Sequence, residues 1–234
     1  MTISSADSFV LESYGYNLTR LAREWSFPPL RGYEAVVSRI FDILLRKEKT
    51  KLPYNPLLID GDGNRRWRVI LEVLRRLSTG EVPDPLPSLQ VIAPNFVALC
   101  GASPTNVQQD ITGIASEVEE RLAQLLLWPS LDACCAPDTC LPRFEAFFSA
   151  TYQAEENVLL LLNDFHCLVG GELLPDAVNM APLIVPALAR RQIQLLGVST
   201  LTQYRQYIER DAAIQRRVQP VVLRSDEEVQ KRGQ

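Results

Sequence analysis

The stretch from Asn55 to Leu74, NPLLIDGDGNRRWRVILEVL, constrains the fold more than any other part of the chain. It predicts a short buried strand, a tight turn and then a helix with apolar residues at helical spacing. The turn consists of Asp60, Gly61, Asp62 and Gly63. Strand, glycine-containing loop and helix are the layout of a phosphate-binding loop, in which backbone N–H groups at a helix N-terminus hold phosphate.

The working form of such a loop also needs later glycines, a lysine for the terminal phosphates and a hydroxyl for magnesium. Here Arg65, Arg66 and Trp67 stand in those places. The stretch therefore predicts the scaffold of a nucleotide site without its usual chemistry. A basic run of Arg65, Arg66 and Arg68 could hold an anion at the helix N-terminus, and a solvated basic patch is an equally good interpretation.

Composition narrows the class of protein. The chain has 234 residues, of which 47% are apolar, and this is enough for one large domain with a sizeable core. The net charge of −4 leaves no basic excess for a nucleic-acid partner. No apolar run reaches the length of a membrane span, and the N-terminus lacks the basic and apolar regions of a signal peptide. We therefore expect a cytoplasmic protein with no membrane insertion.

Strands and helices alternate along the chain. Apolar segments predict strands at 57–59, 90–93, 157–163, 192–198 and 219–223, with amphipathic helices between them. The segment 10–25 reads as a helix interrupted near Gly15, and Asn17 and Asp211 are expected helix N-caps. The alternation predicts an α/β fold: a three-layer sandwich around a five-stranded, mostly parallel sheet.

Polar residues follow three of the predicted strands. They are the Asp60–Arg66 loop, Asn163–Asp164 and Ser199–Thr200. Ligands of parallel α/β sheets bind beyond the C-terminal strand ends, so these segments form the candidate site. Strand ends are often polar in any case, and the pattern alone does not decide for a site.

Five cysteines are present, three of them in the segment CCAPDTC. They are Cys100, Cys134, Cys135, Cys140 and Cys167. No pair has zinc-like spacing and the only histidine is His166, so no metal site is expected. Free thiols in a reducing compartment are the favoured interpretation, with a redox role for the cluster left open.

Several long segments of the chain match a known family. GVSTLTQYRQYIERDAAIQRRVQPVVL (197–223) is the most specific, and LESYGYNLTRLARE (11–24) lies near the N-terminus. The others are NPLLID, GEVPDPL (80–86), NVLLLLNDFHCLVGG (157–171) and PALARRQIQLLGVSTL (186–201). Together they resemble the first nucleotide-binding domain of the Clp-type AAA+ unfoldases and disaggregases, the ClpB-like and ClpV-like groups. The first segment is similar to the family's sensor strand and arginine-finger helix, the second to the segment that leads into that domain, and the others to its middle.

The resemblance implies a domain organisation. It comprises a helical lead-in over 1–33, an AAA+-like large α/β subdomain over 34–224 with insertions near 103–116 and 129–150, and a C-terminal tail over 225–234. The chain stops where the family's helical lid would begin, so a domain without that lid is expected.

The departures from the family affect its catalytic residues. The phosphate-loop lysine falls on Arg66 and the magnesium-binding hydroxyl on Trp67, whose indole cannot ligate magnesium. The acidic pair falls on Asn163, which lacks the charge that organises the metal, and on Asp164, one methylene short of the residue that positions the attacking water. The aromatic pore loop is missing after Gly101. The resemblance thus implies that no residue is catalytic and that no cofactor is expected.

Other family positions are retained. Ser199 or Thr200 matches the sensor, and Arg216 and Arg217 match the paired arginines presented to the nucleotide of a ring neighbour. The resemblance therefore implies a pseudo-ATPase that serves as a protein-interaction or regulatory subunit of a Clp-like ring or a secretion apparatus. Two alternatives stay open. One is an enzyme, an ATPase with a rearranged phosphate loop that binds ATP or ADP through Arg65, Arg66 and backbone N–H groups. The other is a free-standing scaffold.

Simpler structural interpretations are available for four residues. Arg216 and Arg217 could be an ordinary solvated helix end, but we favour the family position for them. For Asp164 we favour the simpler interpretation, in which it caps a turn after its strand. For His166 we favour a packing role over catalysis.

Overall fold

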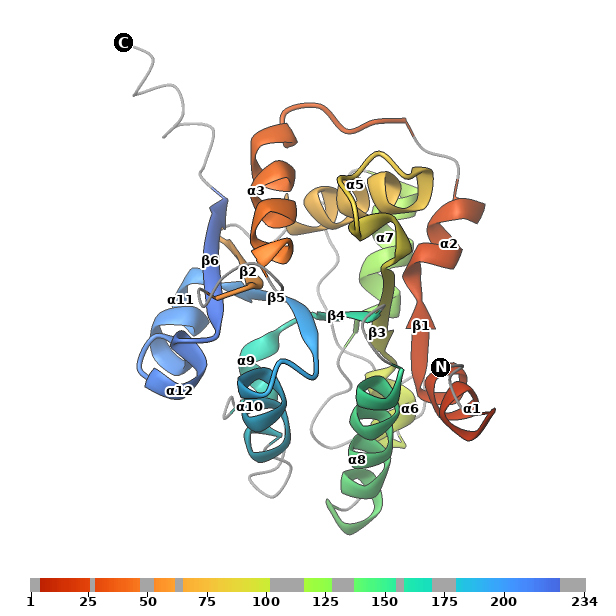
Figure 1. Ribbon diagram of the computed structural model, residues 1–234, viewed down its shortest axis with the longest axis vertical. Coiled ribbons are helices and arrows are strands. Elements are labelled where there is room, and N and C mark those ends of the chain that lie inside the picture. Colours follow the sequence, from red (N-terminus) through yellow and green to blue (C-terminus); the bar gives the residue numbers. More distant parts are fainter. Residues whose placement is uncertain are drawn as a thin grey trace.

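The computed structural model describes residues 5–25, 28–46, 53–61, 65–101, 116–127, 137–154, 158–169 and 180–223. Asp62 and Gly63 of the predicted phosphate loop lie outside these residues, as do Cys134 and Cys135. The same holds for the expected tail and for most of the 103–116 segment. A twisted central sheet with helices on both sides forms the body of the molecule (Figure 1).

The fold belongs to the predicted α/β class. In the described part of the chain it contains six strands in the order β1-β3-β4-β5-β2-β6. Their bounds are β1 (Gly15–Asn17), β2 (Asn55–Asp60), β3 (Gln90–Pro94), β4 (Val158–Leu162), β5 (Gln194–Thr200) and β6 (Val218–Leu223). All neighbours are parallel except β1 and β3, which are antiparallel. The mostly parallel sheet is confirmed, with one strand more than the five expected.

The additional strand is β1, which lies inside the segment predicted as an interrupted helix. The chain forms α1 (Ser5–Tyr14), crosses the sheet edge as β1 and continues as α2 (Leu18–Glu24). A Cβ atom on Gly15 would lie 2.8 Å from the backbone oxygen of Leu11 and 2.9 Å from Cε2 of Phe147. Glycine is therefore needed here because the backbone passes too close to its neighbours for any side chain.

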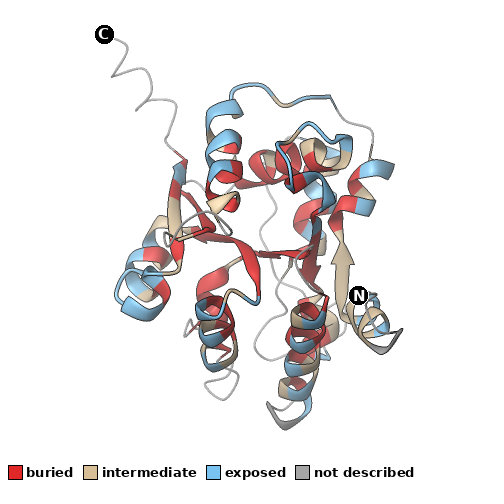
Figure 2. Cartoon of the chain, in the orientation of Figure 1, coloured by how far each residue is buried: buried red, intermediate tan, exposed pale blue. Residues whose placement is uncertain are grey.

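Two layers of helices cover the sheet (Figure 1). One apolar cluster joins it to α2, α3 (Glu34–Leu44), α5 (Arg65–Thr79) and α7 (Glu117–Leu125). The other cluster joins it to α6 (Phe96–Cys100), α8 (Pro137–Gln153), α9 (Phe165–Leu168), α10 (Ala181–Ala189) and α12 (Ala212–Gln215). Along β4 the side chains alternate between the two clusters: Leu159 and Leu161 belong to the first, Leu160 and Leu162 to the second. Every residue of β2 and β4 is buried, which fits central strands covered on both faces (Figure 2).

Short elements complete the chain. These are the 3₁₀ turn η1 (Leu86–Ser88), the helix α11 (Leu201–Gln203) and the π-helical segment η6 (Tyr204–Ile208). Both expected N-caps are confirmed, because Asn17 accepts a hydrogen bond from the N–H of Arg20 and Asp211 accepts from those of Ala213 and Ile214. Among the described residues, no helix is long and apolar enough to cross a membrane.

Candidate functional site

The carboxyl ends of three neighbouring strands bring the predicted site residues to one edge of the sheet. Asp60 at the end of β2 is paired in register with Thr200 at the end of β5. β4 lies on the other side of β5, and its last residue, Leu162, pairs with Gly197. Asn163 follows directly. Segments about 40 and 100 residues apart in the sequence thus meet where parallel α/β sheets bind ligands.

Asp60 supplies an internal anion at the N-terminus of α5. Its side chain is fully buried, and Oδ2 accepts a 2.9 Å hydrogen bond from the backbone N–H of Arg66. The first N–H groups of a helix have no partner within the helix and carry the positive end of its dipole. In a working phosphate-binding loop these groups point at phosphate. Here a carboxylate of the chain itself accepts one of them.

The side chain of Arg66 points toward the end of β4. Its Nη1 lies 3.6 Å from Oδ1 of Asp164, and only 10% and 13% of the two side chains are exposed. The guanidinium also lies over the indole of Trp67, 4.7 Å from the ring centroid. Arg66 therefore lies between an acidic residue and an aromatic ring of the chain.

Trp67 is part of the hydrophobic core. It is 2% exposed and belongs to the cluster that joins α3, α5 and α7 to the sheet. An indole offers one N–H donor and no oxygen, so residue 67 cannot coordinate magnesium. Gly61 is exposed at the start of the loop, and Arg65, the first residue of α5, is half-buried.

Asn163 and Asp164 form a hydrogen-bonded pair after β4. Nδ2 of Asn163 donates to Oδ2 of Asp164 at 2.9 Å and contacts the backbone oxygen of Leu126 at 3.3 Å. Asp164 has left-handed backbone angles (φ 47°, ψ 49°), which are uncommon for a residue other than glycine. It occupies the N-cap position of α9, but its side chain makes no cap hydrogen bond. Its carboxylate instead contacts Arg66 and Asn163, so the turn-capping interpretation of this side chain is wrong.

The sensor-like residues Ser199 and Thr200 have different surroundings. Thr200 caps α11 by hydrogen bonding to the backbone N–H and the side chain of Gln203. Ser199 is fully buried, and within the described structure its hydroxyl has no hydrogen-bond partner. Because most buried polar atoms are satisfied, this hydroxyl is an unusual feature of the site.

Neighbouring polar residues have structural roles that spacing did not reveal. Arg68 donates from Nε to the buried Glu119 at 3.0 Å, which ties α5 to α7. His166 stacks on Tyr207 with 5.8 Å between ring centroids. Burial lowers the pKa of His166, Asp164 opposes that effect and Arg66 adds to it. The imidazole is therefore neutral at pH 7, in keeping with a packing role.

Arg216 and Arg217 lie at the opposite edge of the sheet. They immediately precede β6, whose first residue, Val218, pairs with Asn55 at the start of β2. The structure thus separates the two arginines from Asp60 and Asp164 by the length of a strand. Arg216 is exposed, and Nη1 of Arg217 donates to the backbone oxygen of Ala213 at 2.8 Å.

Among the described residues, no group of three or more His, Cys, Asp or Glu side chains is placed so that it could hold a metal ion. Cys100, Cys140 and Cys167 are buried and form no disulfide. The cysteine cluster predicted from the sequence is thus only partly described, and its redox role stays a prediction.

Comparison with known proteins identifies relatives of the chain. No protein-family model matches it. Chaperone protein ClpC2 of Oryza sativa subsp. japonica is 30% identical over 211 residues, which are 90% of this chain and 19% of the relative. Chaperone protein ClpB of Aquifex aeolicus is 30% identical over 213 residues, 91% of this chain and 18% of the relative. The chain thus spans about a fifth of the length of these curated relatives.

A solved structure shows the same fold. The Saccharomyces cerevisiae Hsp104–ADP complex superposes with a TM-score of 0.62 and 22% sequence identity over 91% of this chain and 30% of that one. The structural likeness supports the α/β architecture. The relationship in sequence rests on the identity to ClpC2 and ClpB. Over about nine-tenths of its length, this chain is a homologue of one segment of the Clp-type AAA+ chaperones.

Proposed function

We propose that this chain is a catalytically degenerate AAA+ domain, a pseudo-ATPase that acts through protein contacts as an interaction or regulatory subunit. The observation that carries the proposal is the 2.9 Å hydrogen bond from the N–H of Arg66 to the buried carboxylate of Asp60. A phosphate group at the N-terminus of α5 would approach this carboxylate in surroundings of low dielectric constant. Like charges repel there much more strongly than in water.

The side chains at the site support the same proposal. Hydrolysis of a nucleotide needs metal ions that bridge its phosphates and a residue that positions the attacking water. At the corresponding positions, Trp67 has no oxygen, Asn163 has no charge and Asp164 is held by Arg66. We therefore expect no bound cofactor.

The proposed partner is an active AAA+ subunit. The chain is homologous to segments of ClpC2 and ClpB, and Arg216 is exposed at the edge of the sheet away from Asp60. A domain can lose its own hydrolysis and still supply arginines that stabilise transition-state charge in a neighbour. We place this chain next to a Clp-like ring subunit, with a secretion apparatus as the second kind of assembly.

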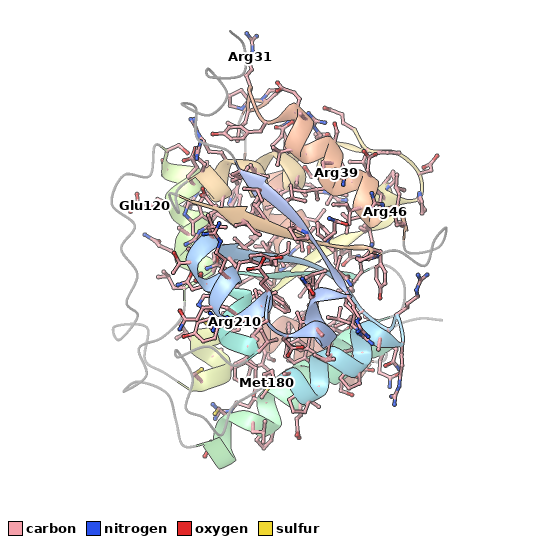
Figure 3. The ribbon with its side chains drawn as sticks, turned by 90° about the vertical axis from the view of Figure 1, so that its left-hand side faces the viewer. Arg31, Arg39, Arg46, Glu120, Met180 and Arg210 are labelled. Atoms are coloured by element: carbon pink, nitrogen blue, oxygen red, sulfur yellow. The ribbon has the colours of Figure 1, made fainter. Side chains whose placement is uncertain are left out.

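Nucleotide binding tests the proposal directly. Calorimetric titration of the purified chain with ATP and ADP, with and without magnesium, should give no magnesium-dependent binding at millimolar nucleotide. Magnesium-dependent binding that disappears in Asp164→Ala and survives in Arg39→Ala would refute the pseudo-ATPase assignment. Arg39 is the control position because it is an exposed residue of α3. Figure 3 shows it well apart from Arg210, which lies next to α12.

Contact with a partner needs its own experiment. The double variant Arg216→Ala/Arg217→Ala should weaken association with a Clp-type ATPase or reduce that partner's hydrolysis rate, whereas Arg39→Ala should leave both unchanged. If the double variant changes neither quantity, the two arginines do not act on a neighbour.

A nucleotide-binding protein with a rearranged loop is the second candidate function. Two observations favour it: the hydroxyl of Ser199 is buried without a partner, and Nε and Nη1 of Arg66 make no hydrogen bond within the described structure. Donors thus remain beside the α5 N-terminus. Magnesium-dependent turnover abolished by Asp164→Ala would establish this function in place of the first.

A further inference from the structure

A groove lies beside β1, the edge strand of the sheet. Residues of α1, β1, α2 and β3 line it, among them Glu12, Gly15, Asn17 and Arg20, and we call it the β1 groove. Figure 1 shows α1 and α2 at the two ends of β1. The volume of the groove is about 280 Å³, just below the usual range of roughly 300–1,000 Å³ for pockets that take drug-sized ligands. Its size and its position along a strand favour an extended segment of chain over a large cofactor.

The backbone of β1 has one paired edge and one open edge. β1 is antiparallel to β3, and the N–H of Asn95 donates to the oxygen of Tyr14 at 2.8 Å. Bonded and non-bonded residues alternate along an antiparallel pair, so Tyr16 is the next residue to bond to β3. The backbone groups of Gly15 and Asn17 therefore point away from β3, and both residues line the groove. Gly15 lies opposite a proline, which has no N–H to donate, and this agrees with the assignment.

Side-chain hydrogen bonds hold the open edge in place where α2 begins. Oδ1 of Asn17 accepts the N–H of Arg20 at 3.0 Å, and Nδ2 of Asn17 donates to Oε1 of Gln90 at 3.1 Å. The hydroxyl of Thr19 accepts the N–H of Val91 at 2.8 Å, so pairing with β3 ends here and the chain turns into α2. The edge is thus formed before any ligand arrives, which reduces the entropy lost on binding.

Two opposite charges lie at the ends of the groove. Glu12 is in the last turn of α1 and Arg20 is in the first turn of α2, and both side chains are exposed. Helix dipoles favour cations at the C-terminus and anions at the N-terminus, so each charge stands at the less favourable end of its helix. In the described part of the chain neither residue belongs to an ion pair. Both charges are therefore available to groups of opposite sign in a ligand.

Apolar surface completes the groove. Leu11 of α1 and Leu21 of α2 are half-buried, and Ile92 of β3 is 5% exposed. A ligand that matches the whole lining has main-chain N–H and C=O groups, an apolar side chain and charges of both signs. A phosphate compound has no cation for Glu12 and would be repelled by its carboxylate.

We propose that the β1 groove binds an extended peptide segment of a partner protein, which adds to β1 as a further strand. An edge strand is a template for such pairing, in which main-chain hydrogen bonds give affinity and side-chain pockets give specificity. The segment carries a basic residue beside Glu12, an acidic residue beside Arg20 and an apolar residue between them. A second copy of this chain fits less well, because it presents the same recess. The inference goes beyond the proposed function, because this contact needs neither the α5 loop nor Arg216 and Arg217.

Two blocked pentapeptides are the probes, acetyl-Lys-Thr-Val-Thr-Glu-amide and acetyl-Glu-Thr-Val-Thr-Lys-amide. Alternate side chains of a strand face the same side, so the valine and both charges of each peptide lie together. Calorimetry on the whole chain at low ionic strength should show that one peptide binds about tenfold more tightly than the other, because only one strand direction matches both charges. Absence of binding by both peptides, or equal binding of the two, overturns the proposal.

Charge exchange tests the two ends of the groove. The double variant Glu12→Lys/Arg20→Glu changes only exposed side chains, so it should fold as the parent does and prefer the other peptide. The control Arg39→Glu reverses a charge on α3 and should keep the preference of the parent. A double variant with the parent's preference overturns the proposal.

A pair of variants at Asn17 tests the main-chain contact. The φ of Asn17 is −79°, which proline can adopt, and Asn17→Pro removes the N–H that points away from β3. Asn17→Ala keeps this N–H, and both variants lose the cap of α2. We expect Asn17→Ala to bind the preferred peptide about tenfold more tightly than Asn17→Pro. Equal affinities overturn strand addition.

Two further measurements separate this contact from others. Peptide binding should be unchanged in Arg216→Ala/Arg217→Ala, and its loss there would overturn the placement in the β1 groove. Sedimentation of the parent tests the second copy as occupant. A dimer that the preferred peptide dissociates would assign the groove to a second copy and overturn the proposal.

Discussion

Nη1 of Arg66 lies 3.6 Å from Oδ1 of Asp164, so the first turn of α5 and the end of β4 are joined by an ion pair of the chain itself. Both side chains are mostly buried, and Asp164 also accepts a hydrogen bond from Asn163. The pair thus links the N-terminus of α5 to the end of β4, two of the segments that form the candidate site.

Removing one charge of this pair should destabilise the chain. Asp164→Asn tolerates the left-handed backbone and keeps the shape of the side chain, but it leaves Arg66 without its carboxylate. We expect a loss of roughly 1–3 kcal/mol in the free energy of unfolding, measured with urea at pH 7.

The double variant Arg66→Leu/Asp164→Asn serves as the control, because it removes both charges. It should recover part of the stability lost in Asp164→Asn. The single variant Arg66→Leu completes the comparison. If the stability losses of Arg66→Leu and Asp164→Asn add up to the loss in the double variant, the ion pair does not couple α5 to β4.

Loss of the Asp60 carboxylate should weaken the start of α5. In Asp60→Ala, a buried N–H of Arg66 loses its acceptor, and we expect a decrease of about 1–3 kcal/mol in stability. Asp211→Ala removes a more exposed N-cap of the same kind and should cost about 1 kcal/mol. Thermal and urea unfolding of both variants would show the ranking, and an Asp60→Ala protein as stable as the parent would contradict the role given to this carboxylate.

Placing a hydroxyl at the magnesium-ligand position should destabilise the chain. Trp67 is 2% exposed, and Trp67→Thr would leave a cavity and a hydroxyl in the core. We expect a loss of about 3–5 kcal/mol, comparable to other deletions of buried aromatic side chains. Trp67→Phe keeps much of the apolar volume and should lose considerably less. Equal stability of Trp67→Thr and the parent would place the indole outside the core.

The layered fold was predictable because it follows from periodicity. Continuous apolar runs such as Val158–Leu162 gave the buried strands, and polar residues such as Asn17 and Asp211 marked helix starts. The edge strand β1 was not predicted because three residues are too few to show a periodic pattern. A glycine at position 15 fits an interrupted helix as well as a strand that passes close to its neighbours. The need for glycine at this position depends in part on Phe147, which is distant in the sequence.

The candidate site was predictable as a set of positions but not as a set of contacts. Parallel topology explains why Asp60 and Thr200 meet. Nothing in the spacing indicated that Asp60 would accept the N–H of Arg66, because that bond depends on the path of the chain between β2 and α5.

Stability should fall in acid through Glu72, which joins α5 to the segment before α3. The residue is 1% exposed, and its carboxylate accepts hydrogen bonds from Arg75, Arg76 and the backbone N–H of Leu30. Burial alone would raise the pKa of Glu72, but these hydrogen bonds and the charge of Arg75 lower it from 4.5 to about 2.

Because the folded-state pKa lies below the unfolded one, the contribution of Glu72 to stability is complete above pH 4.5 and disappears as the pH falls toward 2. The shift corresponds to about 3 kcal/mol. Urea unfolding at pH 6 and pH 3 tests this. Glu72→Gln should be less stable than the parent at pH 6, and it should lose less stability than the parent between pH 6 and pH 3. Glu81→Gln removes the exposed carboxylate that also pairs with Arg75 and should keep most of the parent's pH dependence. An unchanged pH dependence in Glu72→Gln would show that other carboxylates govern the acid transition.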